Sequence, residues 1–455
     1  MRLFQSVDSS VLDEIASATV LKDFKPSEVL FGRDCNHDAY INDLNLLVVV
    51  RGQVEVYTEL SHRTGSTSEK TKELLTIVGE GQTVSSILSI LECLIEPLAD
   101  SAPLTAPATP KQRMMRAQQT WSQERLDTEE FEQTESESVT TTEKEEDDEE
   151  LITAIASTDS LIAQIPLEIF HKLQDKFPRA ITRLTRSIIM RLQRVTLLTM
   201  NKYFGLTNQL VNSNVKSIPP RRRRFQSRED SMTKEMKLRR DFEIALRGFT
   251  KLLQLDEGGC ELLRQHLLIE QHSPGSIVMA PKDPYISITE DRQNDACEPC
   301  LYFIIRGCVD VYLHDDSHIK SEDDEIEVIN SQDHLLYTGR SGDLIGQLAV
   351  VTGDFYYRVV ASEDEVNPPN SNRRQQREAT IVLGKLRKSA FDQLVMYAPS
   401  VMNRVVFMIF LQLAPVVKLI DYAVDWEQRQ AGEILMKQGD TTDGMYIVLS
   451  GRLRA

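Results

Sequence analysis

The sequence is poor in cysteine and has no long apolar run. Six cysteines are scattered over 455 residues, too few and too irregular for a disulfide framework, so we expect a reducing compartment. The longest apolar run, 405–417, is shorter than a helix that spans a bilayer. It predicts a buried helix, with Asn403, Arg404 and Gln412 on one polar face, in preference to a helix seated on a membrane. The charged and polar residues that follow Met1 lead us to expect no signal peptide there.

Positive charge is also in short supply. Lys and Arg number 52 against 69 Asp and Glu, a net charge of −17, which argues against nucleic acid as a partner. The composition, 41% hydrophobic and 27% charged, is that of a folded chain, and 455 residues exceed what one core supports. The four arginines at 221–224 allow two interpretations: a contact for anionic lipid headgroups or a localisation signal, and a solvated linker.

Polar stretches divide the chain into predicted domains. Residues 97–150 are rich in Pro, Thr and Gln and end in an acidic block, which predicts a disordered insertion. The predicted order is a first domain over 1–210, a basic linker over 211–240, a second domain over 241–415 with a loop insertion at 363–377, and the start of a third at 416–455. Ser and Thr residues between 136 and 142, with Ser227 and Ser231, are candidate phosphorylation sites.

Internal repetition predicts the fold. A β-branched run, then Arg-Gly, then alternating apolar residues occurs at 46–57 and again at 301–312, with a shorter copy at 446–454. Each glycine predicts a tight turn or bulge between the strands of a hairpin. A helix precedes the first two copies, at 11–19 and 258–268, and closing helices follow at 166–198 and 389–413. The pattern predicts tandem jelly-roll β-rolls, mainly β with flanking helices.

A glycine-rich turn opens a short helix in each unit, at 79–88 and 342–350. The second reads Gly-Asp-Leu-Ile-Gly-Gln-Leu-Ala and resembles the phosphate turn of cyclic-nucleotide-binding domains. In that family the helix N–H groups face the cyclic phosphate, a Glu accepts from the ribose, and an Arg neutralises the phosphate. The resemblance places a degenerate phosphate turn on Gly342, Asp343, Gly346, Gln347 and Ala349, and a more degenerate one on Gly79, Gly81, Ser85 and Ser86.

The charged residues of that family are missing from both turns. In the first unit Ser85 and Ser86 stand where the family has Gly-Glu, and counting back from Phe170 places Glu150 at the arginine position. In the second unit Gln347 replaces the Glu and Phe355 takes the phosphate position. The following strand then begins at Arg358, and Arg377 closes a loop insertion. We therefore expect no cofactor, with a cyclic nucleotide in the second unit as the alternative.

A finer resemblance rests on 194–199, 203–207 and 419–426, the last reading Leu-Ile-Asp-Tyr-Ala-Val-Asp-Trp. These segments resemble the neuropathy-target-esterase family, and its fungal members above all. The resemblance implies an intracellular phospholipase B/lysophospholipase that converts phosphatidylcholine to glycerophosphocholine at the endoplasmic reticulum membrane. It also implies a membrane helix before the rolls and a patatin-type Ser–Asp lipase domain after them, as partners in cis.

The sequence contains no Gly-x-Ser-x-Gly motif, so we expect no catalytic residue in it. The main hypothesis is a regulatory or scaffolding segment that by itself is soluble and cytoplasmic, beginning in the first domain and ending before the third domain's phosphate turn. The alternatives are a cAMP or cGMP sensor and a stand-alone adaptor. Cys297 and Cys300 have zinc-knuckle spacing, and His314, Asp315, Asp316 and His318 follow, but no second cysteine pair does, so no metal site is expected.

Overall fold

The computed structural model describes residues 7–32, 45–64, 67–86, 88–99, 151–212, 233–280, 298–313, 334–362, 381–424, 429–441, 445–449 and 451–454. The chain folds into two compact units. Unit 1 comprises 1–93, 137–204 and 415–455, and unit 2 comprises 94–136 and 205–414. The predicted insertions, the four arginines, the Ser and Thr candidates, Glu150, Arg377, Cys297 and the residues 314–318 lie outside the described residues, except that α2 includes 97–99.

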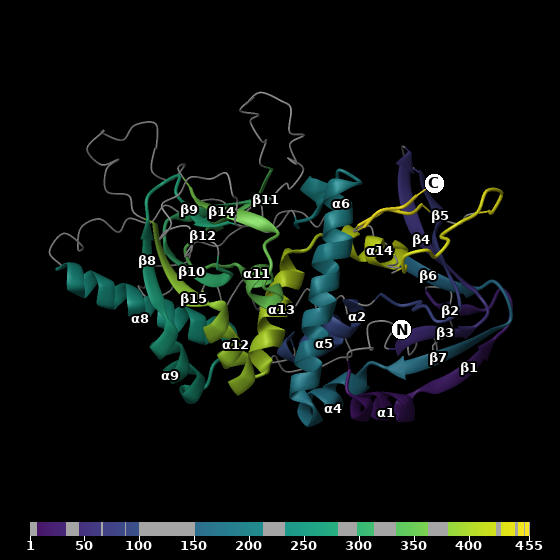
Figure 1. Cartoon of the computed structure of the whole chain (residues 1–455), viewed down its shortest axis with the longest axis horizontal. Helices are drawn as coiled ribbons and strands as arrows, with labels where there is room; N and C mark the ends of the chain where they lie inside the picture. The colour runs from purple at the N-terminus through teal and green to yellow at the C-terminus, as the bar shows by residue number, and fades with distance from the viewer. Residues whose placement is uncertain are drawn as a thin grey trace. The chain divides into compact units, whose positions relative to one another are not determined.

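Unit 1 contains two antiparallel sheets (Figure 1). The first has the order β1-β7-β3, formed by β1 (Val20–Phe24), β7 (Ser160–Pro166) and β3 (Asn45–Arg51). The second has the order β2-β6-β4-β5, formed by β2 (Val29–Phe31), β6 (Leu151–Ala156), β4 (Val54–Thr64) and β5 (Thr67–Val78).

Unit 2 repeats this plan strand for strand. One sheet has the order β13-β10-β15-β8, formed by β13 (Leu344–Ile345), β10 (Cys300–Arg306), β15 (Ile381–Arg387) and β8 (Leu268–His272). The other has the order β12-β11-β14-β9, formed by β12 (Leu335–Arg340), β11 (Cys308–Leu313), β14 (Tyr357–Ala361) and β9 (Ile277–Met279). A bridge between Val48 and Thr83 replaces β13 in unit 1. The predicted fold class, β-rolls in tandem, is confirmed.

The Arg-Gly repeats are corners between sheets, so the prediction of hairpins was wrong. β3 pairs with β7, whereas β4 pairs with β5 and β6, and β10 and β11 likewise belong to different sheets. Gly52 and Gly307 have φ of +95° and +84°, the left-handed backbone that lets the chain cross from one sheet to the other. In the third copy, Gly451 has φ +93°, but the described residues around it form no strand.

The leading and closing helices of unit 1 lie close to the predicted ranges 11–19 and 166–198, whereas the helix at 88–99 runs beyond the predicted turn and the helix at 416–423 was not predicted. They are α1 (Ser9–Ala18), α2 (Leu88–Ala99), which begins in this unit, α4 (Glu168–Lys176), α5 (Pro178–Arg191), the π-helical segment η4 (Leu192–Leu197), α6 (Leu198–Lys202) and α14 (Val416–Ala423). α5 begins with Pro178, which suits a first helical turn. Its buried Ile181, Leu184 and Ile188 recur at helical spacing and form one apolar face.

The helices of unit 2 include one that the sequence placed in a linker. They are the 3₁₀ turn η5 (Thr207–Gln209), α8 (Lys234–Leu253), α9 (Glu257–His266), α11 (Gln347–Thr352), α12 (Lys388–Tyr397) and α13 (Ser400–Gln412). α8 begins inside the predicted basic linker and packs closely on β10 and β15. Gly248 faces the ring of Phe303, and Gly384 leaves room for Ala245. A side chain at either glycine would force the helix away from the sheet.

α13 is the buried helix that the run at 405–417 predicted. Its residues from Val401 to Leu411 are all buried. The polar face was placed wrongly, because Asn403 and Arg404 are 6% and 3% exposed, and Asn403 donates a hydrogen bond to the Leu94 carbonyl, 3.0 Å away. Among the described residues, no helix combines the length and hydropathy needed to span a bilayer.

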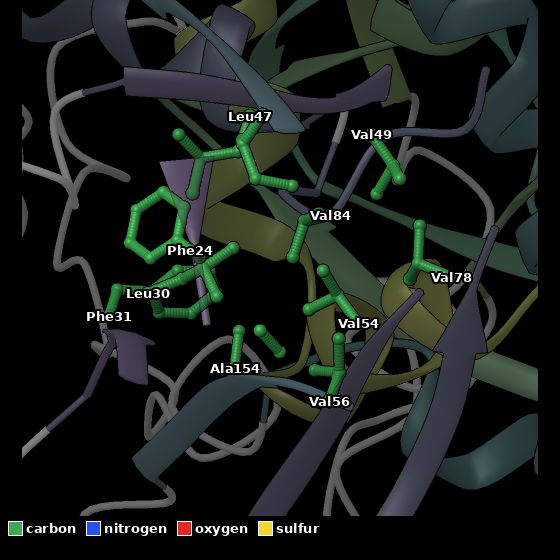
Figure 2. Close-up of a cluster of buried hydrophobic side chains, with 12 residues drawn as sticks. Phe24, Leu30, Phe31, Leu47, Val49, Val54, Val56, Val78, Val84 and Ala154 are labelled. Carbon is green, nitrogen blue, oxygen red and sulfur yellow. The ribbon is translucent and has the colours of Figure 1, made fainter. Parts of the chain in front are cut away.

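The interior of unit 1 is a closed apolar cluster. Figure 2 shows its side chains converging between the strands. The members are Phe24, Leu30, Phe31, Leu47, Val49, Val54, Val56, Val78, Val84, Ala154, Ala156 and Ile162. Leu75, Ile152 and Tyr422 pack against them. Apolar side chains therefore fill the roll, and most of them come from its two sheets.

Candidate functional site

In unit 2 the glycine-rich turn is held by its own side chains. Gly342, with φ +93°, donates its N–H to the Ile304 carbonyl at 2.8 Å. The Asp343 carboxylate accepts from the Arg340 N–H, also at 2.8 Å. Asp343 therefore stabilises the turn by a hydrogen bond back to a residue three positions earlier, and this role needs no ligand.

Gly346 is required by a neighbouring strand. Its φ is +88°, and a Cβ at this position would collide with the carbonyl oxygen of Cys300 on β10. The resemblance placed Gly346 in a degenerate phosphate turn. The structure gives another reason for the glycine, which is the close approach of the β10 backbone.

Gln347 turns its amide back onto the same turn. The side chain is 2% exposed, and Nε2 donates to the Leu344 carbonyl at 2.7 Å. Oε1 has no hydrogen-bond partner among the described residues. A buried acceptor without a partner costs about 1–3 kcal/mol, so this side-chain oxygen could take a hydrogen bond from a further donor.

The N–H groups at the start of α11 face a tyrosine of this chain. Burial raises the pKa of Tyr357 well above that of a free phenol, and hydrogen bonds from the backbone N–H groups of Leu348, Gly346 and Ala349 oppose the rise. We call these three N–H groups the amide cradle. The phenolic oxygen of Tyr357, which is 7% exposed, thus takes the place where the resemblance puts a phosphate.

No cation from β14 reaches the amide cradle. Side chains alternate between the two faces of a strand, and Tyr357 and Val359 point inward from β14. Arg358 therefore points outward, where its guanidinium lies 5.8 Å from the ring centre of Tyr312. Phe355, at the predicted phosphate position, carries no charge. The cradle accordingly has hydrogen-bond donors, and among the described residues β14 brings no positive side chain to it of the kind that a phosphate needs.

The first turn opens with the same backbone hydrogen bond to the neighbouring strand and has different side chains. Gly81, with φ +79°, donates to the Val49 carbonyl at 2.7 Å, and Gln82 Oε1 accepts from the Gly79 N–H at 2.7 Å. Gly81 and Gln82 are thus the equivalents of Gly342 and Asp343.

Ser85 occupies the place of Gly346 and bonds to a neighbouring strand. Its hydroxyl accepts from the Leu47 N–H at 3.1 Å and donates to the Asn45 carbonyl at 3.2 Å. Both partners lie on β3, so this serine also serves the packing of the roll.

Ser86 bonds to a residue that is 335 positions away in the sequence. Its hydroxyl donates to the Asp421 carboxylate at 2.5 Å and accepts from the Leu88 N–H, at the start of α2, at 3.1 Å. Sequence reasoning missed Asp421 and Tyr357. Asp421 lay in the segment 419–426 that carried the family resemblance, and Tyr357 immediately precedes Arg358, but nothing in the pattern showed what either side chain would face.

No metal-ligating cluster was found within the described residues. Burial raises the pKa of the Cys300 thiol to about 12, an effect that nearby Lys385 opposes and Glu298 and Glu270 reinforce. A protonated, buried thiol is neither a nucleophile nor a metal ligand. The predicted partner Cys297 lies outside the described residues.

Two curated proteins share recognisable sequence with the chain. Patatin-like phospholipase domain-containing protein 6 of Pongo abelii is 29% identical over 214 residues, which is 47% of this chain and 13% of that protein. Neuropathy target esterase sws of Drosophila persimilis is 26% identical over 180 residues, 38% and 11% of the two chains. The chain is similar to neuropathy target esterase and patatin-like phospholipase proteins.

A longer alignment extends this similarity to esterase relatives over both units. Patatin-like phospholipase domain-containing protein 7 of Mus musculus is 22% identical over 403 residues, 67% of this chain and 29% of that protein. The chain therefore corresponds to a minor part of each esterase relative's length. No protein-family model matches it.

Solved structures that the chain resembles include regulatory subunits of protein kinase A. A structure titled cAMP bound PfPKA-R (141-441) is 11% identical with a TM-score of 0.21, covering 88% of this chain and 80% of that one. The regulatory subunit of a cAMP-independent protein kinase A from Trypanosoma brucei is 14% identical with a TM-score of 0.24, covering 88% and 86%. At TM-scores this low, the similarity to these structures carries no argument, and the description of the fold rests on the strand order given above.

Proposed function

We propose that this chain is a regulatory and scaffolding segment of an intracellular phospholipase B of the neuropathy-target-esterase type, and that its rolls work without a cyclic nucleotide. The observation that supports this most strongly is the Tyr357 hydroxyl in the amide cradle. A phosphate would have to displace a buried phenol and would meet no cation from β14. The sequence similarity to esterases supports the attachment to a lipase.

In this proposal the partners are a patatin-type lipase domain in cis and the cytoplasmic face of the endoplasmic reticulum membrane. The whole protein turns over phosphatidylcholine to glycerophosphocholine, and the rolls position or regulate the lipase domain. Neither roll needs a catalytic residue, a metal or a cofactor for this role.

Calorimetric titration of the whole 455-residue chain with cAMP and with cGMP tests the ligand-free part of the proposal. We expect no binding heat up to millimolar nucleotide. Micromolar binding by the wild-type chain would overturn it.

Two variants sharpen this experiment. Tyr357→Ala opens the amide cradle without supplying charge and should still not bind. Phe355→Arg combined with Tyr357→Ala offers both donors and a cation, and should gain binding if the cradle retains the shape of a phosphate site.

A cyclic-nucleotide sensor is the second candidate, and one observation favours it. Gln347 Oε1 is buried without a partner, and a ribose hydroxyl is a donor that could meet it. Gln347→Leu tests this candidate beside the wild type: a sensor binds nucleotide as the wild type and loses that binding in the variant, whereas a scaffold gives flat titrations for both.

A stand-alone adaptor is the third candidate. Sequencing the transcript beyond the codon for Ala455 distinguishes it from a lipase segment. We expect an open reading frame that supplies a Gly-x-Ser-x-Gly motif; a stop codon followed by no such frame would favour the adaptor.

A further inference from the structure

α14 docks on unit 1, although it lies after the whole of unit 2 in the sequence. In Figure 1 it lies beside the long helix that α5, η4 and α6 form, and it contacts β5 as well as η4. Tyr422 of α14 packs against the apolar cluster inside the roll. Arg191, at the end of α5, donates to the Val424 carbonyl at 3.2 Å, so the end of α14 is held as well as its middle.

Asp421 is the charged centre of this contact. The carboxylate side chain is 3% exposed. It accepts from Ser86 at 2.5 Å and from Thr196 at 3.5 Å, and Arg191 Nη1 lies 4.0 Å from it. Burying a carboxylate is unfavourable unless it is paired and hydrogen-bonded. The three partners come from two separate segments, and together they satisfy this charge.

Ser86 links the Asp421 carboxylate to the start of α2. Ser86 belongs to the glycine-rich turn and its hydroxyl accepts from the first N–H of α2, so the carboxylate lies one hydrogen bond beyond the start of that helix. A helix start favours negative charge. Arg191 adds a full positive charge on the other side. The turn of unit 1 thus faces an anion that the chain itself supplies.

We infer that unit 1 carries a docking surface for an acidic–aromatic helix, and that its occupant is α14 of the same chain. The surface, which we call the α14 seat, consists of Ser86, Arg191 and Thr196, with the adjoining apolar interior. Asp421 supplies the anion and Tyr422 covers the apolar side chains. Release of α14 would separate residues 416–424 from the α14 seat, so the seat is a point at which unit 1 can be regulated.

Hydrogen–deuterium exchange on the whole chain tests this inference. Asp421→Asn leaves Arg191 buried without its counter-charge, and we expect exchange within 416–424 to rise by more than about tenfold while the strands of unit 2 keep their protection. Unchanged exchange in 416–424 would overturn the inference. So would a loss of protection over all strands of unit 1, because the carboxylate would then support the fold at large and not the docking of one helix.

Lys418→Ala is the matched control. It removes an ion pair that joins α14 to Glu92 on α2, but Lys418 is 46% exposed, and exposed pairs contribute little. We expect exchange in 416–424 to stay close to that of the wild type. An effect equal to that of Asp421→Asn would show that any change in α14 releases it, and would contradict a specific role for the buried carboxylate.

A rescue experiment separates charge pairing from loss of packing. Arg191→Met alone leaves Asp421 without its cation, and combining it with Asp421→Asn removes both charges. We expect the double variant to protect 416–424 better than either single variant. Additive loss of protection would overturn the inference. The result does not depend on whether either roll binds a nucleotide, so it is independent of the proposed function.

Discussion

Gly346 stabilises unit 2 in two ways: it has no side chain, and its N–H donates a hydrogen bond. Without a side chain it lets the Cys300 carbonyl of β10 come close, and its N–H is one of the three donors that face Tyr357. The same residue thus contacts a strand, belongs to a turn and faces the phenol of Tyr357. Substitutions at Gly346 and at Tyr357 separate the effect of the missing side chain from the effect of the hydrogen bonds.

Gly346→Ala should lower the free energy of unfolding of unit 2 by about 2–4 kcal/mol, because a Cβ adds a collision with backbone to left-handed strain. Gly81→Ala in the first turn is the matched control. Gly81 also has a positive φ, but nothing lies within 4 Å of a Cβ built there, so only strain of about 1–2 kcal/mol is expected. Urea unfolding of both variants measures the difference, and equal losses would contradict the collision.

Tyr357→Phe removes the acceptor from the amide cradle and leaves the ring in place. We expect a loss of about 1–3 kcal/mol in the free energy of unfolding, since buried N–H groups then lack a partner. Tyr446→Phe makes the same chemical change on a side chain that is 50% exposed, and should be neutral within about 0.5 kcal/mol. Thermal unfolding of the two variants compares them; a neutral Tyr357→Phe would show that water or a neighbour satisfies the cradle.

Pairs of elements depend on charges as well as on apolar packing. β15 carries Lys385, whose side chain is 1% exposed and whose Nζ lies 2.9 Å from the Glu270 carboxylate on β8. His272 lies 3.3 Å from the same carboxylate. Burial by itself would raise the pKa of Glu270, but the hydrogen bonds and charges of His272 and Lys385 bring it below the ordinary value of 4.5.

We predict that the free energy of unfolding of unit 2 falls in acid because of this strand pair. A pKa that is lower in the folded state means that Glu270 stabilises the fold above about pH 4.5 and that the contribution is lost as the pH falls through the folded value. Glu270→Gln should cost about 3–5 kcal/mol at pH 7 and flatten the acid side of the pH profile. Urea unfolding at pH values about one unit apart between about pH 3 and 7 measures both the loss at pH 7 and the shape of the pH profile. Glu243→Gln, in a pair that is 47% and 42% exposed, should do neither.

The sequence was sufficient for elements that depend on local pattern, and insufficient where distant segments meet. The repeat around Gly52 and Gly307 predicted equivalent strands, because alternation is a property of neighbouring residues. It did not show that each glycine is a corner, since strand pairing is decided by partners far along the chain. The family comparison directed attention to positions 347 and 355, whereas the group that fills the cradle comes from Tyr357. Asp421 could not be placed for the same reason: its partner Ser86 lies 335 residues away.

At the scale of the whole molecule, unit 2 is inserted within unit 1. The segment 205–414 belongs to unit 2, and the segments on both sides of it belong to unit 1. Residues that are adjacent in the sequence can therefore belong to units that unfold with different free energies. A change in residues 415–455 affects the stability of unit 1, which also contains the first residues of the chain.

A chain shortened to 1–414 should weaken unit 1 and spare unit 2. Removing α14 exposes apolar side chains that Tyr422 covers and leaves Arg191 without Asp421. We expect the amide exchange of β4 and β6 to rise, and that of β11 and β14 to stay as in the longer chain. Faster exchange confined to β11 and β14 would mean that the last forty or so residues stabilise their neighbours in sequence instead.

The π-helical segment η4 (Leu192–Leu197) holds one residue more than an α-helix of the same rotation would. Each residue of an α-helix advances by about 100°, so an extra residue inserted without such a turn would rotate everything after it by that angle. The wide turn absorbs the extra residue, and α6 continues in the direction that α5 began. The helix can therefore carry an additional residue at this point while the Thr196 hydroxyl faces Asp421.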